Sequence, residues 1–132
     1  MSPSAIRTTG LRRTFDTTVA VDALDLDVAE GEIFGLVGPD GAGKTTTMRM
    51  LTGYLAPSAG TAAVMGCDVV EAPIEARRHI GYLPEGAPLY GDMTALAFLR
   101  FVAEMRGLRG AVAKRAIEAA ITRTDLGEVL HR

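Results

Sequence analysis

Gly38-Pro39-Asp40-Gly41-Ala42-Gly43-Lys44-Thr45 combines three glycines with a lysine and a threonine within eight residues. It fits the pattern in which two glycines, separated by four other residues, are followed by lysine and then by serine or threonine. Glycines allow the backbone to wrap closely around phosphate oxygens, so that successive N–H groups at the start of a helix point at the anion. The stretch therefore predicts a phosphate-binding loop.

The residue types at the end of this loop suit a nucleotide bound with a metal ion. Lys44 is one of only two lysines in a chain with 12 arginines. As a point charge it would reach the β and γ phosphates, and the Thr45 hydroxyl would ligate Mg²⁺. Thr46 is placed to contact the α phosphate. The alternative, a glycine-rich turn that matches by chance, is disfavoured by what lies on either side of the loop.

The flanking segments predict a strand, the loop and a helix in succession. Residues 33–37 form a short, wholly apolar run, which is typical of a strand buried on both faces of a parallel sheet. After the loop, Met48, Leu51 and Leu55 recur at helical spacing until Pro57 ends the pattern.

Further from the loop, the pattern continues to mix strands and helices. Residues 5–11 and 19–28 are expected to form an antiparallel pair, the second strand with one wet face. Two more short strands are predicted at 61–65 and 80–83. The remaining elements are helices, expected at 73–78, from Thr94 to Gly107 and around 113–121.

Composition narrows the class of protein. A chain of 132 residues with 48% hydrophobic residues can bury one ordinary core. The net charge of -2 leaves no basic footprint for nucleic acid. The single cysteine, Cys67, favours a reducing compartment. The sequence has no signal peptide and nothing close to the ~20 apolar residues of a membrane span, so we expect a soluble, cytoplasmic chain without a transmembrane segment.

Two classes of phosphate-loop protein fit poorly. A GTPase reads guanine with an Asn-Lys-x-Asp motif, and this chain contains no asparagine and no glutamine. A small-molecule kinase usually begins with the strand that leads into its phosphate loop, whereas here two strands and a turn come first. A kinase remains a distant alternative.

The order and spacing of five pieces resemble the ATPases of ABC transporters. The pieces are Phe15, Ala20-Val21-Asp22, the loop 38–46, the segment 54–60 and Ile80-Gly81-Tyr82-Leu83-Pro84-Glu85. The resemblance implies an α/β fold: a P-loop NTPase core with an N-terminal antiparallel β subdomain and the start of a helical subdomain. It implies a single incomplete ABC ATPase domain over 1–132, with the β subdomain and core in 1–86 and the first part of the helical subdomain in 87–132.

Within that family, the run Pro88-Leu89-Tyr90-Gly91-Asp92-Met93-Thr94, followed by Phe98-Leu99-Arg100-Phe101, looks like the exporter branch. This branch handles drugs, ions, polysaccharides or gliding-motility components. The resemblance implies a dimer with a second ATPase subunit, bound to a membrane permease at the cytoplasmic face of the cell membrane.

The resemblance also assigns site residues. Phe15 would stack on adenine, the alternative being an ordinary core residue. Glu85 stands where the family usually has a glutamine that approaches Mg²⁺ and the attacking water, the alternative being an exposed acid. The implied catalytic residues are Lys44 and Glu85, and the implied metal ligands are Thr45 and Glu85. The expected contacts to ATP are Phe15, Gly38, Pro39, Asp40, Gly41, Ala42, Gly43, Lys44, Thr45 and Thr46.

Several parts of the family's catalytic apparatus are missing from these residues. The chain has no Leu-Ser-Gly-Gly signature, no apolar strand ending in Asp-Glu and no switch histidine. We therefore expect a fragment or a truncated reading frame that leaves a gap in the central sheet. Such a chain should bind MgATP better than it hydrolyses it. The alternative is a nucleotide-binding remnant without ATPase activity.

Overall fold

The structure, a computed structural model, describes residues 3–86 and 90–132. Pro88 and Leu89, part of the exporter-type run, lie outside the described residues. The chain divides into two compact units, Met1–Leu83 and Pro84–Arg132, which we describe separately. The predicted subdomain boundary between residues 86 and 87 stays a prediction.

A long antiparallel hairpin forms one edge of the sheet in the first unit. β1 (Ser4–Phe15) pairs with β2 (Thr18–Ala29), and a turn at Asp16 and Thr17 joins them. β2 buries Val28 and half-buries Leu24 and Leu26, while the aspartates between them are exposed. The predicted antiparallel pair with one wet face is confirmed.

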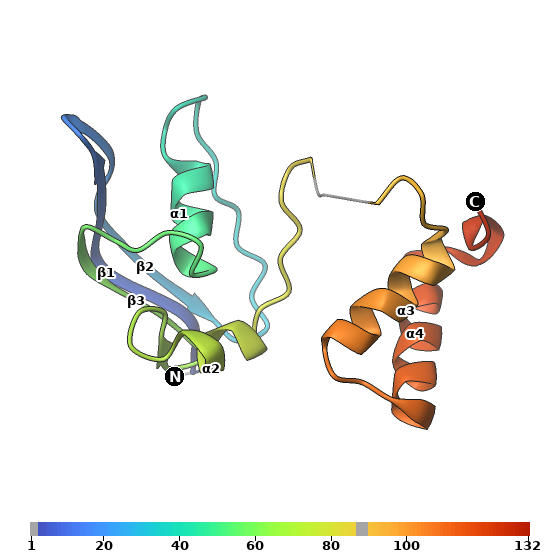
Figure 1. Ribbon diagram of the computed structural model, residues 1–132. Helices are drawn as coiled ribbons and strands as arrows, with labels where there is room; N and C mark the ends of the chain where they lie inside the picture. Colours follow the sequence, from blue (N-terminus) through green and yellow to red (C-terminus); the bar gives the residue numbers. More distant parts are fainter. Residues whose placement is uncertain (1–2, 87–89) are drawn as a thin grey trace. The chain divides into compact units, whose positions relative to one another are not determined.

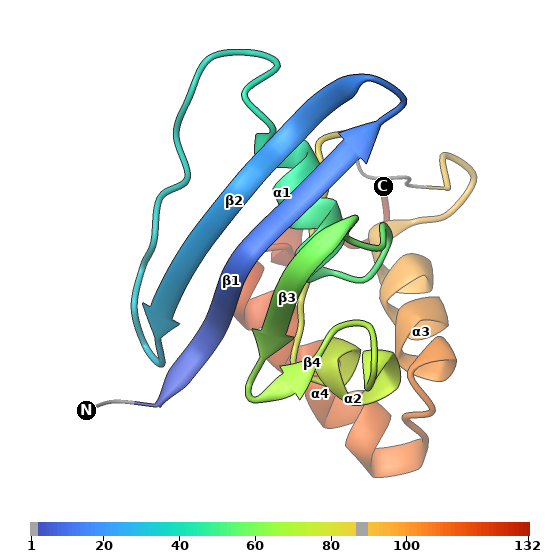
Figure 2. The same ribbon diagram turned by 90° about the vertical axis from the view of Figure 1, so that its left-hand side faces the viewer.

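The hairpin continues into a small antiparallel sheet. β3 (Ala59–Val64) pairs with β1, and the short β4 (Cys67–Asp68) pairs with β3, giving the order β2-β1-β3-β4 (Figure 2). Met65 and Gly66 link β3 to β4 with φ values of 49° and 77°. Positive φ at both positions is the geometry of a tight two-residue hairpin turn.

Helix α1 (Lys44–Leu51) contacts β2 and β3, and supplies the centre of the core (Figure 1). Met50 is completely buried there. Helix α2 (Pro73–Arg78), at the predicted position, adds Ala76. The buried members of the core are Leu11, Val21, Met50, Leu51, Ala62, Val64, Val69 and Ala76.

Two predicted strands do not form. Residues 33–37 and 80–83 have no regular secondary structure and pair with no strand within the described residues. Ile33 is 99% exposed and Val37 90% exposed, so the expected burial on both faces is also wrong. The physical reason is pairing: an apolar run becomes a central strand only between neighbouring strands, and the sheet of the first unit has all its described pairs elsewhere.

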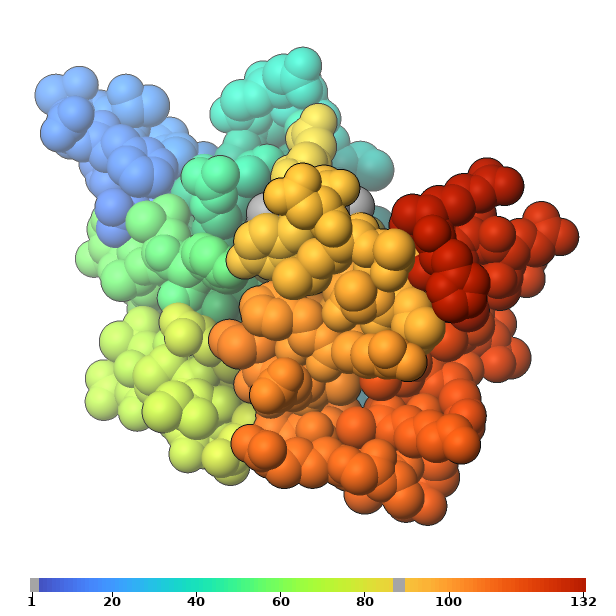
Figure 3. Space-filling view, turned by 45° about the vertical axis from the view of Figure 1, so that its right-hand side comes forward, coloured from blue at the N-terminus to red at the C-terminus, as the bar shows by residue number. Residues whose placement is uncertain are grey.

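The second unit is helical, as predicted. α3 (Ala95–Met105) begins at Thr94, whose hydroxyl accepts a hydrogen bond from the Ala97 N–H at 3.2 Å. The chain turns at Gly107 with φ 73°, and α4 (Gly110–Thr124) packs against α3 (Figure 3). A short 3₁₀ helix, η1 (Gly127–Val129), follows.

No helix in the described part of the chain is long and apolar enough to cross a membrane.

Candidate nucleotide-binding site

The predicted phosphate loop is an exposed turn that leads directly into α1. Its backbone has φ values of 82° at Gly41 and 92° at Gly43, a left-handed conformation that glycine adopts without steric cost. The Ala42 N–H donates to the Pro39 carbonyl at 3.2 Å and closes the turn. All five residues from Gly38 to Ala42 are exposed, so their backbone is open to a ligand.

Gly43 fixes the loop against the hairpin. A Cβ atom at this position would lie 2.3 Å from the Ala20 carbonyl oxygen and 3.0 Å from Cγ2 of Val21. No side chain fits there without moving β2. The glycine is therefore needed both for its φ and for the close approach of loop and strand.

The start of α1 presents free backbone donors. The Thr47 N–H donates to the Gly43 carbonyl at 2.8 Å, which is the first bond of the helix. The N–H groups of Lys44, Thr45 and Thr46 precede it and have no carbonyl one turn earlier to receive them. The first turn contains no acidic residue and no side-chain cap. The positive end of the helix dipole is therefore available to an anion.

The Lys44 side chain folds back over the loop. Its Nζ donates to the carbonyl oxygens of Gly38 at 2.6 Å and of Pro39 at 2.7 Å. An ammonium group has three donors, so one remains for a phosphate oxygen. The two backbone contacts hold the positive charge at the loop instead of leaving it in solvent.

Three consecutive threonines have different environments. Thr45 is exposed and Thr46 is half-buried, whereas Thr47 is only 3% exposed. The Thr47 hydroxyl donates to the Gly43 carbonyl at 2.9 Å and is committed to the fold. The Thr45 hydroxyl is the one that remains open to a ligand, and a hydroxyl oxygen is a hard donor of the kind that Mg²⁺ takes.

Phe15 lies at the end of β1, close to the loop along the hairpin. It pairs with Thr18 in the β1–β2 register, and Ala20, which Gly43 contacts, is two residues further along β2. Two residues of a strand span about 7 Å. Phe15 is 43% exposed as a residue and does not belong to the buried core.

Glu85 lies just after Pro84, at the start of the helical unit. It is exposed and belongs to the second unit, whereas the loop belongs to the first. Its predicted role stays a prediction. Within residues 3–86 and 90–132, no group of three or more acidic, histidine or cysteine side chains could hold a metal ion by itself.

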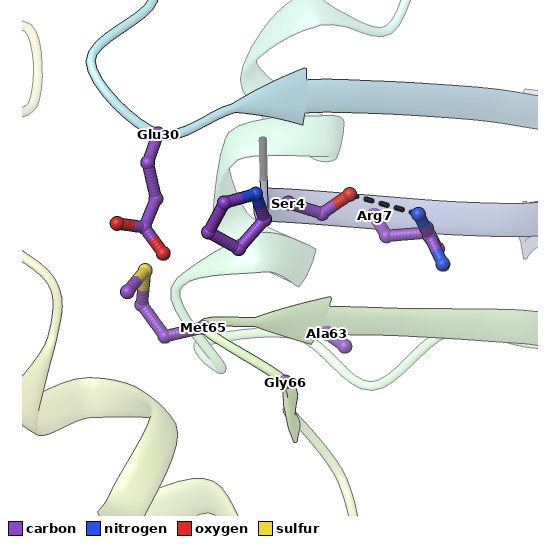
Figure 4. Close-up of a pocket in the computed structure, with 7 residues that line it drawn as sticks. Ser4, Arg7, Glu30, Ala63, Met65 and Gly66 are labelled. Carbon is purple, nitrogen blue, oxygen red and sulfur yellow. Dashed lines mark hydrogen bonds between the residues drawn. The ribbon is translucent and has the colours of Figure 1, made fainter. Parts of the chain in front are cut away.

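One cavity of the first unit lies apart from the loop. It has a volume of about 440 Å³, and its lining includes Ser4, Arg7 and Glu30. Figure 4 shows these residues near the ends of the strands. Beside it, Arg7 Nη2 donates to Asp27 at 2.9 Å, and the Ser4 hydroxyl also donates to this carboxylate. The Ser4 hydrogen bond, and then that of Arg7, lower the pKa of Asp27 below its ordinary value. This cluster is a local stabilising contact between β1 and β2.

Sequence reasoning missed Arg13. Its guanidinium carbon lies 4.6 Å from the centre of the Phe15 ring, and its Nη1 donates to the Ala56 carbonyl at 2.8 Å. The sequence pattern that could have indicated this contact is an arginine two positions before a phenylalanine in a strand. Alternate residues of a strand share a face, so the two side chains are neighbours. That signal is weak, since exposed strands often carry arginine.

Comparison with known proteins identifies the family. The family model described as "ABC transporter" matches residues 21–132. The probable multidrug ABC transporter ATP-binding protein YbhF of Escherichia coli (strain K12) is 45% identical over 76% of this chain and 17% of its own length. The daunorubicin/doxorubicin resistance ATP-binding protein DrrA of Streptomyces peucetius is 38% identical over 97% of this chain and 39% of its own length.

A solved structure gives the same result for the fold. The structure described as an ATP-binding subunit of an ABC transporter superposes with a TM-score of 0.81 at 26% identity, covering 97% of this chain and 53% of that one. The predicted fold class is confirmed, although the chain spans only part of each of these relatives. This chain therefore belongs to the ABC transporter family, whose nucleotide-binding domain it matches.

Proposed function

We propose that this chain binds MgATP through the loop from Gly38 to Thr46. We propose further that, within a complete and dimerised ATPase, it takes part in ATP hydrolysis that drives transport through a membrane permease. The observation that carries the proposal is the geometry of the loop: left-handed glycines, free N–H groups at the start of α1 and a lysine ammonium held at the same place.

The phosphates are assigned to the loop backbone and to Lys44. The N–H groups of Lys44, Thr45 and Thr46 offer a positive helix end to the phosphate oxygens. The remaining Nζ donor of Lys44 would bond an oxygen of the β or γ phosphate, near both of which its charge would lie, while its other two donors keep their carbonyl partners. Because the charge is already in place, little side-chain entropy is lost when the nucleotide binds.

The metal ion is assigned to the exposed hydroxyl of Thr45, with phosphate oxygens and water as its other ligands. Mg²⁺ usually keeps several waters and takes few protein ligands, which suits a site without an acidic cluster. When bound, the ion would neutralise charge that develops on the phosphates. Glu85 is proposed as a further ligand or catalytic contact in the complete domain.

The base is assigned to Phe15. An exposed aromatic ring at the end of the hairpin can stack on adenine through its flat face. Phe15 and Gly43 lie against positions two residues apart on β2, which supports a single nucleotide that contacts both the Phe15 ring and the loop.

Hydrolysis requires groups that these residues do not supply. We assign these groups to the rest of a complete, dimeric ATPase. They are the general base, a further carboxylate that holds the metal ion, and the contacts that the opposite subunit makes to the γ phosphate. The 132-residue chain alone is accordingly proposed to bind nucleotide with little turnover. Family membership argues against the unrelated kinase.

The names of the relatives support the exporter branch. One is described as a probable multidrug protein, another as a daunorubicin/doxorubicin resistance protein and a third as a Nod factor export protein. We propose by this likeness that the chain serves an exporter, with a second ATPase subunit and a permease as partners at the cytoplasmic face of the membrane.

The test is an equilibrium titration of MgATP against the wild-type chain, Lys44→Ala and Lys114→Ala. Lys114 is the other lysine of the chain, exposed on α4 and 4.0 Å from Glu118, so it is a matched control for loss of a lysine. Lys44→Ala should weaken MgATP binding about 10- to 150-fold, since a charged hydrogen bond is worth about 1.5–3 kcal/mol. Lys114→Ala should bind like the wild type. Equal affinities for all three proteins would refute the proposal.

A second measurement addresses turnover. ATP hydrolysis is assayed for the chain alone and for the same chain joined to a C-terminal segment that carries a Leu-Ser-Gly-Gly stretch and a strand ending in Asp-Glu. Turnover that appears only in the joined protein supports the proposal. Lack of turnover in both would favour the non-catalytic remnant.

A further inference from the structure

The side chain of Arg13 covers one face of the Phe15 ring. Its guanidinium carbon lies 4.6 Å from the ring centre, within the range of a cation–π contact. A flat ring has two faces, and here one of them is already occupied. The 43% exposure of Phe15 therefore leaves only the other face for a ligand.

Neighbouring contacts hold Arg13 in this position. Its Nη1 donates to the Ala56 carbonyl at 2.8 Å, in the segment that follows α1. Ser58 in the same segment fastens the strand on both sides of Arg13: its N–H donates to the Arg12 carbonyl, and its hydroxyl accepts from the Thr14 N–H. The guanidinium is thus tied to a fixed part of the first unit.

Hydrogen bonding alone does not explain the arrangement. The Nε of Arg13 is buried and has no hydrogen-bond partner within the described residues. A buried donor without a partner is costly, so stability alone would favour another position of the side chain. The contacts that this position does satisfy are the Nη1 hydrogen bond to Ala56 and the cation–π contact with the Phe15 ring.

We propose that Arg13 is a positioning residue for the base of the bound nucleotide. It holds the Phe15 ring in one orientation and presents the uncovered face to the base. A cation on one face also draws electron density from the ring, so the opposite face stacks better on an electron-rich purine. This inference rests on the proposed function, because it needs a nucleotide whose phosphates occupy the loop.

The competing role for an arginine near a phosphate loop is direct contact with the phosphates. The geometry favours the base, since Nη1 is committed to Ala56 and the guanidinium plane is engaged by Phe15. A ligand without a base separates the two roles, because it keeps the phosphate contacts and loses the stacking.

The experiment compares MgATP with magnesium tripolyphosphate in equilibrium titrations of the wild-type chain, Arg13→Ala, Arg13→Lys and Arg12→Ala. Arg13→Ala should weaken MgATP binding by about three- to tenfold, the scale of a lost aromatic–base arrangement, and leave tripolyphosphate binding unchanged. Arg13→Lys keeps the charge but loses the planar stack, so it should show the same ATP-selective loss to a smaller degree. Arg12→Ala is the control: Arg12 bonds the exposed Asp22 at 3.0 Å and should not change either affinity.

The outcomes distinguish the role of Arg13 from the proposed binding of nucleotide by the loop. An equal loss of both ligands in Arg13→Ala, or no loss of either, overturns the role of Arg13. Wild-type binding that depends on Lys44 but not on Arg13 overturns this inference and leaves the proposed function in place. No MgATP binding by the wild type removes both. Thermal melting checks that each variant folds; if Arg13→Ala does not, wild-type affinities in a folded Arg13→Lys overturn the inference.

Discussion

The two segments that flank the phosphate loop differ sharply in how they are held. After the loop, α1 buries Thr47, Met50 and Leu51 against the sheet. Before the loop, residues 33–37 are wholly apolar, yet Ile33 is 99% exposed and Val37 90% exposed. Both segments carry large apolar side chains, but within the described residues only those of α1 are buried against the sheet.

This difference indicates that the residues at the C-terminal end of the loop determine its backbone conformation. Gly43 abuts the Ala20 carbonyl, Thr47 bonds the Gly43 carbonyl and Lys44 folds back onto Gly38 and Pro39. All three contacts are made by residues of α1 or by Gly43, which directly precedes it. The cradle for phosphate is therefore expected to survive changes in residues 33–37 and to fail with changes in α1.

The largest effect is expected when one apolar side chain is truncated in each of the two segments and the free energies of unfolding are compared. Met50→Ala removes a completely buried side chain and should lower the free energy of unfolding by about 2–5 kcal/mol. Val37→Ala, on the exposed side, should change it by less than about 0.5 kcal/mol. Chemical denaturation measures both. Comparable losses would mean that residues 33–37 are packed in solution, and the contrast between the two segments would not stand.

A second pair of variants separates backbone conformation from close approach within the loop. Gly41→Ala and Gly43→Ala both place a side chain at positive φ, which costs about 1–2 kcal/mol. Only Gly43→Ala also places a Cβ 2.3 Å from a backbone oxygen, while Gly41 has open space around it. Gly43→Ala should therefore lose at least about 2 kcal/mol of stability, more than Gly41→Ala. Equal losses in denaturation would show that the loop does not rest on β2.

The threonines provide a third comparison. Thr47→Val removes the buried hydroxyl that bonds Gly43 and should lower stability by about 1 kcal/mol. Thr45→Val should leave stability unchanged and reduce the dependence of ATP binding on Mg²⁺. Thermal melting and titrations with and without Mg²⁺ measure the two properties. If Thr45→Val lowered stability and left the Mg²⁺ dependence of ATP binding unchanged, Thr45 would serve the fold and not the metal ion.

The smallest effect is expected at Asp27, away from the loop. Ser4 and Arg7 lower the pKa of its carboxyl below 3.8, so the folded protein holds this proton less tightly than the unfolded chain. Its stabilising contribution is present above pH 3.8 and is lost as the pH falls through the lowered value. Melting temperature followed from about pH 5 to 2 should fall less steeply in Asp27→Asn than in the wild type. Parallel curves would contradict the lowered pKa.

Much of this arrangement was predictable because local rules determine it. Alternation of Leu24, Asp25 and Leu26 predicted β2, and the spacing of the glycines with Lys44 predicted the loop. The segment 33–37 was not predictable, because an apolar run reports what a strand could bury and not whether neighbouring strands are there to bury it. Arg13 was missed for a related reason: its contact with Phe15 depends on how Ala56 returns to the hairpin, which no local pattern contains.

The most direct test of the central claim is to locate the nucleotide on the backbone. Amide chemical shifts of the isotope-labelled chain are recorded during a titration with MgATP. If the loop binds the nucleotide, the largest shifts should occur in the amides from Gly41 to Thr46, with smaller shifts near Phe15 and little change in α4. Saturable shifts centred elsewhere, with the amides of the loop unmoved, would contradict it.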